Sequence, residues 1–157
     1  MISVRPAAPD DFDAVCRILG EGDALHATAL PDRFQVTTPS RDRRFYDEYL
    51  TNPRRALLVA ASDDDVVGVA ELHLVRVDGS PPVRARRYVE VVSVVVAAGQ
   101  QRRGVGLALM RSAERWATDN EASAIELNVY AFNTAARRWY EELGYQPLSE
   151  RLRRALS

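Results

Sequence analysis

Cysteine, histidine, lysine and long apolar runs are all scarce in this chain of 157 residues, and each scarcity excludes a class of protein. The single cysteine, Cys16, can form neither an internal disulfide framework nor a cysteine-based metal site. The two histidines, His26 and His73, are too few for a histidine-rich zinc or iron centre. All 21 basic residues are arginine, so no lysine side chain is available for modification.

Charge and hydropathy restrict the candidates further. With 22 acidic and 21 basic residues, the formal net charge of −1 provides no general attraction to nucleic acid or to an anionic membrane. No apolar run approaches the roughly 18 residues that a membrane span needs. The first residues also lack the apolar core of a secretion signal. We therefore expect a cytoplasmic protein that binds neither nucleic acid nor membrane.

The length and composition are typical of one domain. The chain is 46% apolar, and a chain of this size buries about 70% of its extended surface, so it needs no disulfide or metal to fold. We find no repeat, linker or shift in composition that would separate two domains. The sequence thus predicts a single domain over residues 1–157.

The spacing of apolar residues and chain breakers predicts alternating strands and helices. The first half is expected to contain a strand at 2–5, a helix from Pro9 to about Leu19 that ends at Gly20 and Gly22, an irregular stretch at 23–40, and a helix at 41–50. The second half is expected to contain a hairpin of strands 56–61 and 66–77, a valine-rich strand at 88–97, a helix after Gly104, a strand at 125–130 and a helix from Asn133 to Leu143. One or two further strands are expected within 145–156. The order β-α-α-β-β-β-α-β-α-β predicts an α/β domain with a mixed central sheet flanked by helices.

The most informative segment joins the valine-rich strand to the next helix through Gly104 and Gly106. Backbone N–H groups from Arg102 to Leu107 are expected to converge there, and the positive end of the helix dipole adds to them. Such a turn binds a phosphate or a pyrophosphate. We expect glycine at both positions because a Cβ would hold the anion away from the amides.

Three phosphate-binding motifs compete for this turn. A P-loop requires Lys followed by Ser or Thr after its second glycine, whereas Val105 follows Gly104. A dinucleotide fingerprint requires a third glycine where Leu109 stands, and the acidic residue some 20 positions on, Glu126, lies inside a strand. The third motif, Gln/Arg-x-x-Gly-x-Gly/Ala, matches residues 101–106.

A second motif follows further along the chain. Residues 127–145 read LNVYAFNTAARRWYEELGY and match L-x-V-x-x-x-N-x-x-A-x-x-x-Y-x-x-x-G-[FY]. With the opening I-x-x-R-P-A, the two motifs make the chain resemble the GNAT superfamily of N-acetyltransferases over essentially its whole length. The resemblance implies direct transfer of the acetyl group of acetyl-CoA to a primary amine of a small molecule, peptide or protein. It implies no metal, and it leaves a homodimer open.

The resemblance also implies roles for individual residues. In GNAT enzymes the strand before the loop separates from its neighbour, and its backbone binds the pantetheine arm and the thioester. Asn133 occupies the position of a cofactor-contacting Asn and is also a natural helix N-cap. Tyr140 occupies the position of the general acid, and a phenol with a pKa near ~10 is protonated when a thiolate with a pKa near ~8.5 needs a proton. The expected cofactor-binding residues are Val94, Val95, Val96, Gln101, Arg102, Arg103, Gly104, Val105, Gly106, Leu107, Asn133 and Tyr140.

The general base is less clearly marked. An alkylamine with a pKa of about 10 arrives protonated, so a group must accept its proton. Glu90 is the first candidate, because it precedes Val94 by four residues and is expected to share its face of the strand. Glu71, with His73 on the same face of the preceding strand, is the second, and water is the third. Asn128 stands where members that acetylate protein N-termini carry Glu, which argues against that acceptor class.

For two further segments, the sequence allows both a functional and a purely structural interpretation. The segment 26–34 resembles the helix and loop that cover the acceptor pocket in many GNAT enzymes, or else packs on the sheet. The arginines at 84, 86 and 87 form either a solvated hairpin end or a binding patch. Cys16 is expected in the core, which disfavours an acyl-enzyme route. The rival functions are a non-catalytic acyl-CoA-binding sensor and a nucleotide-dependent oxidoreductase.

Overall fold

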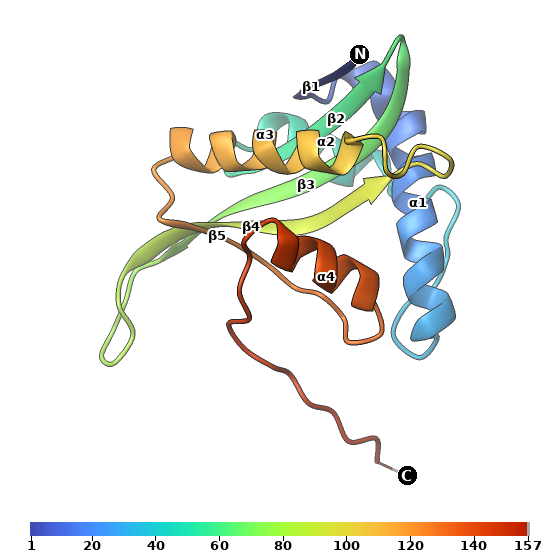
Figure 1. Cartoon of the computed structure of the whole chain (residues 1–157). Coiled ribbons are helices and arrows are strands. Elements are labelled where there is room, and N and C mark those ends of the chain that lie inside the picture. The colour runs from blue at the N-terminus through green and yellow to red at the C-terminus, as the bar shows by residue number, and fades with distance from the viewer. Residues whose placement is uncertain (157) are drawn as a thin grey trace.

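The computed structural model describes residues 1–156 and contains, within them, one sheet with helices on both of its faces (Figure 1). The elements are β1 (Ile2–Pro6), the 3₁₀ helix η1 (Pro9–Asp11), α1 (Phe12–Ala29), α2 (Arg43–Thr51), β2 (Arg55–Ser62), β3 (Asp65–Val77), β4 (Arg86–Val96), α3 (Val105–Asp119), β5 (Ala124–Leu127) and α4 (Thr134–Glu142). Among the described residues, no helix is both long enough and apolar enough to cross a membrane. The predicted α/β class and the predicted order through α4 are confirmed.

The five strands follow one another across the sheet in chain order, β1-β2-β3-β4-β5. Neighbouring strands are antiparallel except for β4 and β5, which are parallel. The parallel pair requires a crossover connection, and α3 supplies it. The sheet is therefore mixed, as predicted.

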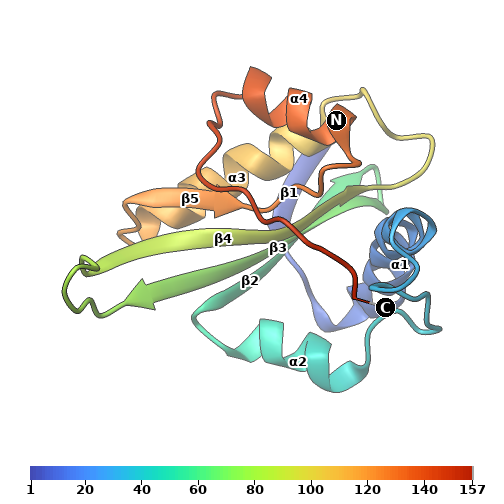
Figure 2. The same ribbon diagram turned by 90° about the horizontal axis from the view of Figure 1, so that it is seen from below.

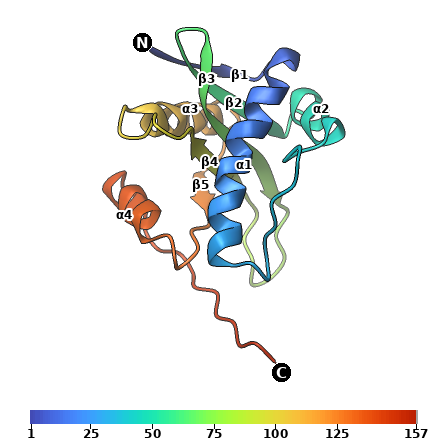
Figure 3. The same ribbon diagram turned by 90° about the vertical axis from the view of Figure 1, so that its right-hand side faces the viewer.

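Each face of the sheet is covered by its own helices (Figures 2 and 3). On one face, which we call the α1/α2 face, Ile18 and Tyr46 are fully buried against β2 and β3. On the opposite α3/α4 face, Leu72, Leu109 and Met110 are buried in a second cluster. Alternate residues of a strand point to opposite faces, so the side chains of each regular stretch of β3 or β4 alternate between these two faces of the sheet.

Helix α1 is longer than the sequence predicts. It was expected to end at Gly20 and Gly22, but it continues to Ala29. A Cβ added at Gly22 would lie 2.8 Å from a methyl carbon of Val95, so this glycine allows α1 to pack closely against β4. A glycine inside a helix costs about 1 kcal/mol relative to alanine, and the close packing offsets that cost.

The strands predicted at the end of the chain are not formed. Strand β5 ends at Leu127 instead of continuing to residue 130, and residues 143–156 contain no strand. The tail runs away from the sheet in Figure 1, and Leu152 is 90% exposed. Its leucines are four residues apart and alternate with Glu150 and Arg154, so an extended strand would have no continuous apolar face. An ion pair of 2.7 Å between Arg153 and Asp32 connects residues 143–156 to the segment that follows α1.

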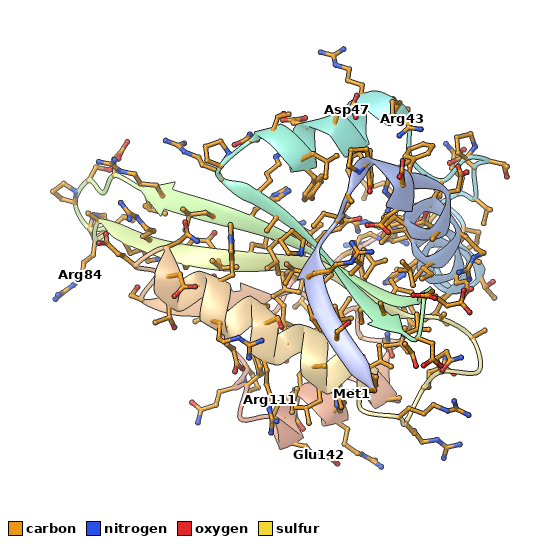
Figure 4. All side chains as sticks on the ribbon, turned by 90° about the horizontal axis from the view of Figure 1, so that it is seen from above. Met1, Arg43, Asp47, Arg84, Arg111 and Glu142 are labelled. Carbon is orange, nitrogen blue, oxygen red and sulfur yellow. The ribbon has the colours of Figure 1, made fainter. Side chains whose placement is uncertain are left out.

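The arginines of the β3–β4 connection form a solvated hairpin end. Figure 4 shows Arg84 pointing away from the body at the tip of this hairpin. The guanidinium of Arg86 lies over the Tyr88 ring at 5.2 Å, and Arg87 pairs with Glu121 at 3.2 Å. Arg84 therefore points to solvent, while Arg86 and Arg87 each contact a partner within the protein.

Candidate functional site

Strands β4 and β5 are paired over only part of their length. The pairing runs from Tyr88 opposite Ala124 to Val91 opposite Leu127, where β5 ends. Strand β4 continues to Val96 and remains paired with β3 on its other side. The β4 backbone from residue 92 to residue 96 therefore has no strand on its outer edge. This open edge contains Val94, Val95 and Val96, the residues predicted to bind a ligand through their backbone.

A β-bulge lies at the start of the open edge. Val91 is opposite Leu72 and Ser93 is opposite Glu71, so Val92 is an additional residue on β4. The additional residue reverses the alternation of side chains, so Glu90 lies on the α1/α2 face while Val94 packs into the α3/α4 cluster. The prediction that Glu90 and Val94 share a face is therefore wrong. Side chains from both faces of the sheet flank the open edge of β4, and this edge begins at Val92, two residues after Glu90.

The turn that follows β4 presents free backbone donors. The hydrogen bonds found within residues 1–156 use none of the N–H groups of residues 101–107. Arg102 and Gly104 have φ angles of 60° and 82°, a left-handed pair that turns the chain into α3. The donors at the helix start combine with the positive end of the helix dipole, so the turn is suited to an anion such as a phosphate.

The two glycines of this turn have different physical roles. A Cβ at Gly104 would meet no atom within 4 Å, so its requirement for glycine comes from its positive φ, and the space in front of it is open. A Cβ at Gly106 would instead lie 3.1 Å from two carbons of the Trp139 ring. The expectation that both glycines make room for an anion is thus corrected at Gly106, which makes room for α4.

The side chains of this turn form only long hydrogen bonds with neighbouring residues. The Gln101 amide donates to the carbonyl of Val96 at 3.5 Å, and Arg103 donates to the Gln100 side chain at 3.5 Å. Arg102 and Arg103 are exposed and make no ion pair among the described residues. Their guanidinium groups therefore remain available to a ligand.

Helix α4 places Tyr140 next to the same cluster that holds Val94. The Tyr140 ring packs against Trp139 at 4.8 Å and against Tyr145 at 5.7 Å between centroids. Burial raises the pKa of Tyr140 to about 12, so the phenol is protonated at neutral pH. Within residues 1–156 its hydroxyl makes no hydrogen bond, so the proton is free to be donated. Asn133 caps the helix, its Oδ1 accepting from the N–H of Ala136 at 3.2 Å.

A buried polar cluster lies under α1 and α2, on the α1/α2 face. Glu71 is only 3% exposed, and burial raises its pKa to about 7. The Tyr49 hydroxyl donates to Glu71 Oε2 at 3.5 Å, and Arg41 lies 3.8 Å from Oε1. Arg41 itself pairs with Asp23 at 2.6 Å, so its charge is shared between two carboxylates.

His73 belongs to the same polar cluster and is partly exposed. Its Nε2 lies 2.7 Å from the Tyr49 hydroxyl, and burial lowers the pKa of the imidazole. Glu90 is directly opposite His73 on β4. The structure thus brings Glu90 and Glu71, the two candidate bases, together with His73 on one face. Tyr49 and Arg41 were missed, although Tyr46 and Tyr49, three residues apart on a predicted helix, indicated a face turned toward the sheet.

Comparison with known proteins identifies the family. A family model described as the acetyltransferase (GNAT) family matches residues 23–145, which contain the open edge, the glycine turn and the motif on α4. The chain belongs to the GNAT acetyltransferase family. Its GNAT relatives include an uncharacterized N-acetyltransferase from Mycobacterium tuberculosis, 35% identical over 101 residues. That alignment covers 64% of this chain and 59% of the relative, so the chain matches about three fifths of the length of the curated relative.

Solved structures share the GNAT fold over nearly the whole chain. A Bacillus halodurans protein, solved in a mutant form, has a TM-score of 0.95 at 21% identity and covers 99% of both chains. An aminoglycoside acetyltransferase from an uncultured soil metagenomic sample has a TM-score of 0.71 at 13% identity and covers 99% of this chain and 97% of the other. At these identities the likeness shows the fold alone.

An aromatic cluster connects the end of α1 to the segment between β5 and α4. His26 at the end of α1 packs against Phe34 at 5.1 Å and against Tyr130 at 5.5 Å between centroids. Phe34 and Phe132 also contact Tyr130 or His26. The segment 26–34 therefore packs against the β5–α4 connection, and not simply on the sheet.

Proposed function

We propose that this chain is an acetyl-CoA-dependent N-acetyltransferase that transfers the acetyl group directly to a primary amine of a small molecule, peptide or protein. We further propose that residues 1–157 form one acetyltransferase domain. The observation that carries the proposal is the continuity of the open β4 edge with the free N–H groups of residues 101–107. A long ligand with a diphosphate at one end and an acyl group at the other matches this arrangement.

The residues present fit acetyl-CoA. The turn at Gly104 offers unpartnered backbone donors and open space for a pyrophosphate, and the exposed Arg102 and Arg103 add positive charge. The backbone of residues 94–96 offers N–H and C=O groups to the pantetheine amides, and Asn133 and Gln101 are the side chains proposed to contact the cofactor beside it. Bound there, acetyl-CoA supplies an activated acetyl thioester.

The proposed chemistry uses two side chains and the strand backbone. Glu90 accepts a proton from the acceptor ammonium, which leaves a neutral amine to form the new N–C bond as the C–S bond breaks. Backbone N–H groups of the open edge stabilise the negative charge on the carbonyl oxygen. A phenol with a raised pKa remains protonated until Tyr140 donates its proton to the departing thiolate. The second proton that the nitrogen loses as the amide forms passes to the Tyr140 phenolate, directly or through water, and restores the phenol.

Glu71 is the alternative base. Its pKa of about 7 suits proton transfer at neutral pH, but it is only 3% exposed. Glu90 is partly exposed and stands two residues before the open edge. We therefore propose Glu90 as the group that meets the amine, with Glu71 and water as the alternatives.

The decisive test measures free thiol release from acetyl-CoA with a panel of amines. Thiol release with at least one amine supports the proposal, while tight CoA binding without turnover on any amine would indicate an acyl-CoA-binding sensor. Competition of NAD with acetyl-CoA would instead support a nucleotide-dependent enzyme. Because the chain has no lysine, acetylation of its own side-chain amines cannot contribute background.

A matched pair of variants tests the phosphate turn. Asn and Asp both tolerate the left-handed backbone of Gly104, and they differ only in charge. Gly104→Asp is expected to weaken CoA binding by calorimetry at least about tenfold more than Gly104→Asn. Equal affinities of the two variants would contradict anion binding at this turn.

A further inference from the structure

His73 lies between a cation and a carboxylate in one row across the sheet. Strand register places it directly opposite Arg55 on β2 and directly opposite Glu90 on β4. Directly opposite residues of neighbouring strands point to the same face, with their Cβ atoms about 5 Å apart. The Glu90 side chain, proposed above to accept the proton of the amine, is therefore an immediate neighbour of the imidazole.

Only one nitrogen of the His73 ring is engaged. Nε2 lies 2.7 Å from the Tyr49 hydroxyl, whereas Nδ1 has no hydrogen-bond partner among the described residues. Burial lowers the pKa of the imidazole and the charge of Arg55 lowers it further, while Glu90 and Glu48 act in the opposite direction. A neutral imidazole accepts a proton at a free nitrogen, provided that this nitrogen carries the lone pair.

The Tyr49 hydroxyl decides which nitrogen of His73 carries the lone pair. Tyr49 is buried, and its hydroxyl contacts two groups, His73 Nε2 at 2.7 Å and Glu71 Oε2 at 3.5 Å. Burial raises the pKa of Tyr49, so the phenol keeps its single proton. An ionised carboxylate can only accept a hydrogen bond. While Glu71 is ionised, Tyr49 therefore donates to Glu71 and accepts from Nε2–H, which leaves the lone pair of His73 on Nδ1.

Glu71 controls the direction of this chain of hydrogen bonds. Burial raises its pKa to about 7, against the effect of Arg41 at 3.8 Å from Oε1, and Asp23 adds to the rise. Above this pH the carboxylate accepts from Tyr49. Below it, a protonated Glu71 donates to the Tyr49 oxygen and Tyr49 donates to Nε2, so the proton of neutral His73 moves to Nδ1. The imidazole then has no free lone pair.

We propose that His73 takes the proton of the amine from Glu90, and that Tyr49 is the residue that positions His73 for this step. This inference rests on the proposed function. The ammonium N–H bond breaks as Glu90 binds the proton, and the proton then passes from the Glu90 carboxyl to Nδ1 of His73. Glu90 is thereby ionised again, and the Tyr49–Glu71 pair stabilises the imidazolium. The imidazolium finally loses the proton to water, because His73 is partly exposed.

Nitrogen NMR of isotope-labelled protein measures the tautomer of His73 without any turnover. The chain has only two histidines, and His26 supplies an internal reference. Its Nδ1 lies 2.8 Å from the carbonyl of Gly22, which can only accept, so His26 carries its proton on Nδ1. At about pH 8.5, where Glu71 is ionised, His73 is expected to carry its proton on Nε2 instead. A proton on Nδ1 of His73 at that pH would overturn the inference, and His26→Gln assigns the signals.

Three variants test the hydrogen-bonded chain. Glu71→Gln is expected to reverse the tautomer of His73, because a glutamine amide donates to the Tyr49 oxygen and turns the Tyr49 proton toward Nε2. Tyr49→Phe is expected to give a mixture of both tautomers. Tyr46→Phe is the matched control, since it removes from the same helix a hydroxyl that donates to the Ala8 carbonyl, and it is expected to keep the wild-type tautomer. Identical His73 signals in the wild type, Glu71→Gln and Tyr49→Phe would refute the inference.

Turnover of an accepted amine tests the transfer step itself. Tyr49→Phe is expected to lower kcat by about tenfold, with the KM of the amine and the affinity for CoA unchanged. His73→Ala is expected to lower kcat by at least about tenfold, and free imidazole is expected to restore part of the loss. Tyr46→Phe is expected to retain the wild-type kcat.

Failure of this inference can be distinguished from failure of the proposed function. Wild-type kcat in both Tyr49→Phe and His73→Ala would refute the role of His73 and leave the acetyltransferase activity intact. Absence of thiol release from the wild type with every amine would overturn the proposed function, whatever the tautomer of His73.

Discussion

Gly106 lies against the indole of Trp139, because a Cβ on this glycine would be 3.1 Å from two carbons of that ring. The residue belongs to the glycine turn by sequence, but its contact is with α4. The glycine thereby couples the start of α3, where the proposed pyrophosphate site lies, to the helix that carries Tyr140. Gly106, which belongs to the predicted phosphate motif, thus sets how closely the start of α3 approaches α4.

Gly106→Val is expected to destabilise the protein by about 1–3 kcal/mol, because the added carbons overpack against Trp139. The free energy of unfolding from denaturant titration measures the effect. Adding Trp139→Leu to the same chain is expected to recover part of the loss, because the smaller side chain leaves room. Equal stability of Gly106→Val and the wild type would mean that α4 moves aside freely.

Tyr140→Phe is expected to lower kcat by roughly 100-fold, the scale of losing a general acid, with little change in CoA affinity. The measurement is thiol release with an accepted amine, and calorimetry gives the affinity. Tyr145→Phe is the matched control, because it removes a neighbouring buried hydroxyl that has no partner in the described residues. Full activity of Tyr140→Phe would assign the acid to another group.

Glu90→Gln is expected to remove or displace the acidic limb of the pH profile of kcat/KM, since the base must be ionised to accept a proton. Glu71→Gln serves as the comparison. If Glu71→Gln alters the limb and Glu90→Gln does not, Glu71 is the base. An unchanged limb in both variants points to water.

The buried carboxyl of Glu71 is expected to make stability depend on pH. Its pKa rises from an ordinary value of 4.5 to about 7 on folding, so the folded protein binds more protons between these values than the unfolded chain. This contribution to stability, up to about 3 kcal/mol, is therefore present below pH 4.5 and lost as the pH rises toward 7.

The pH dependence is isolated by a difference measurement. The lowered pKa of His73 acts in the opposite direction, so the quantity to follow is the free energy of unfolding of the wild type minus that of Glu71→Gln. This difference should fall between pH 4.5 and pH 7. A constant difference across that range would show that Glu71 titrates normally.

The tail and the core are expected to respond differently to the same substitution. Leu72 is fully buried, and Leu72→Ala should cost about 2–5 kcal/mol. Leu152 is 90% exposed, and Leu152→Ala should change the free energy of unfolding by less than about 0.5 kcal/mol. Thermal or denaturant unfolding at several protein concentrations measures both. A large cost at Leu152 would show that the tail packs against something in solution.

Much of the fold could be predicted because its signals are local. The valine-rich run predicted strand β4, although only Val89 and Val91 of it are buried. Gly104 predicted the start of α3, and Asn133 predicted the cap of α4. The errors came where a distant contact overrides a local signal. Gly22 was interpreted as a helix end, but it accommodates Val95 from a strand more than seventy positions away.

In the candidate site too, some features could be predicted from the sequence and others depend on tertiary contacts. The sequence by itself determined the order of the elements, the glycine turn with its free donors and the position of Tyr140 on its helix, because each depends on residues close together in the chain. Only the tertiary structure decided which side chains share a face. The bulge at Val92 separated Glu90 from Val94, and strand register placed Glu90 between His73 and Glu126. Register depends on hydrogen bonds between strands that are remote in sequence, and one additional residue moves every following side chain to the other face.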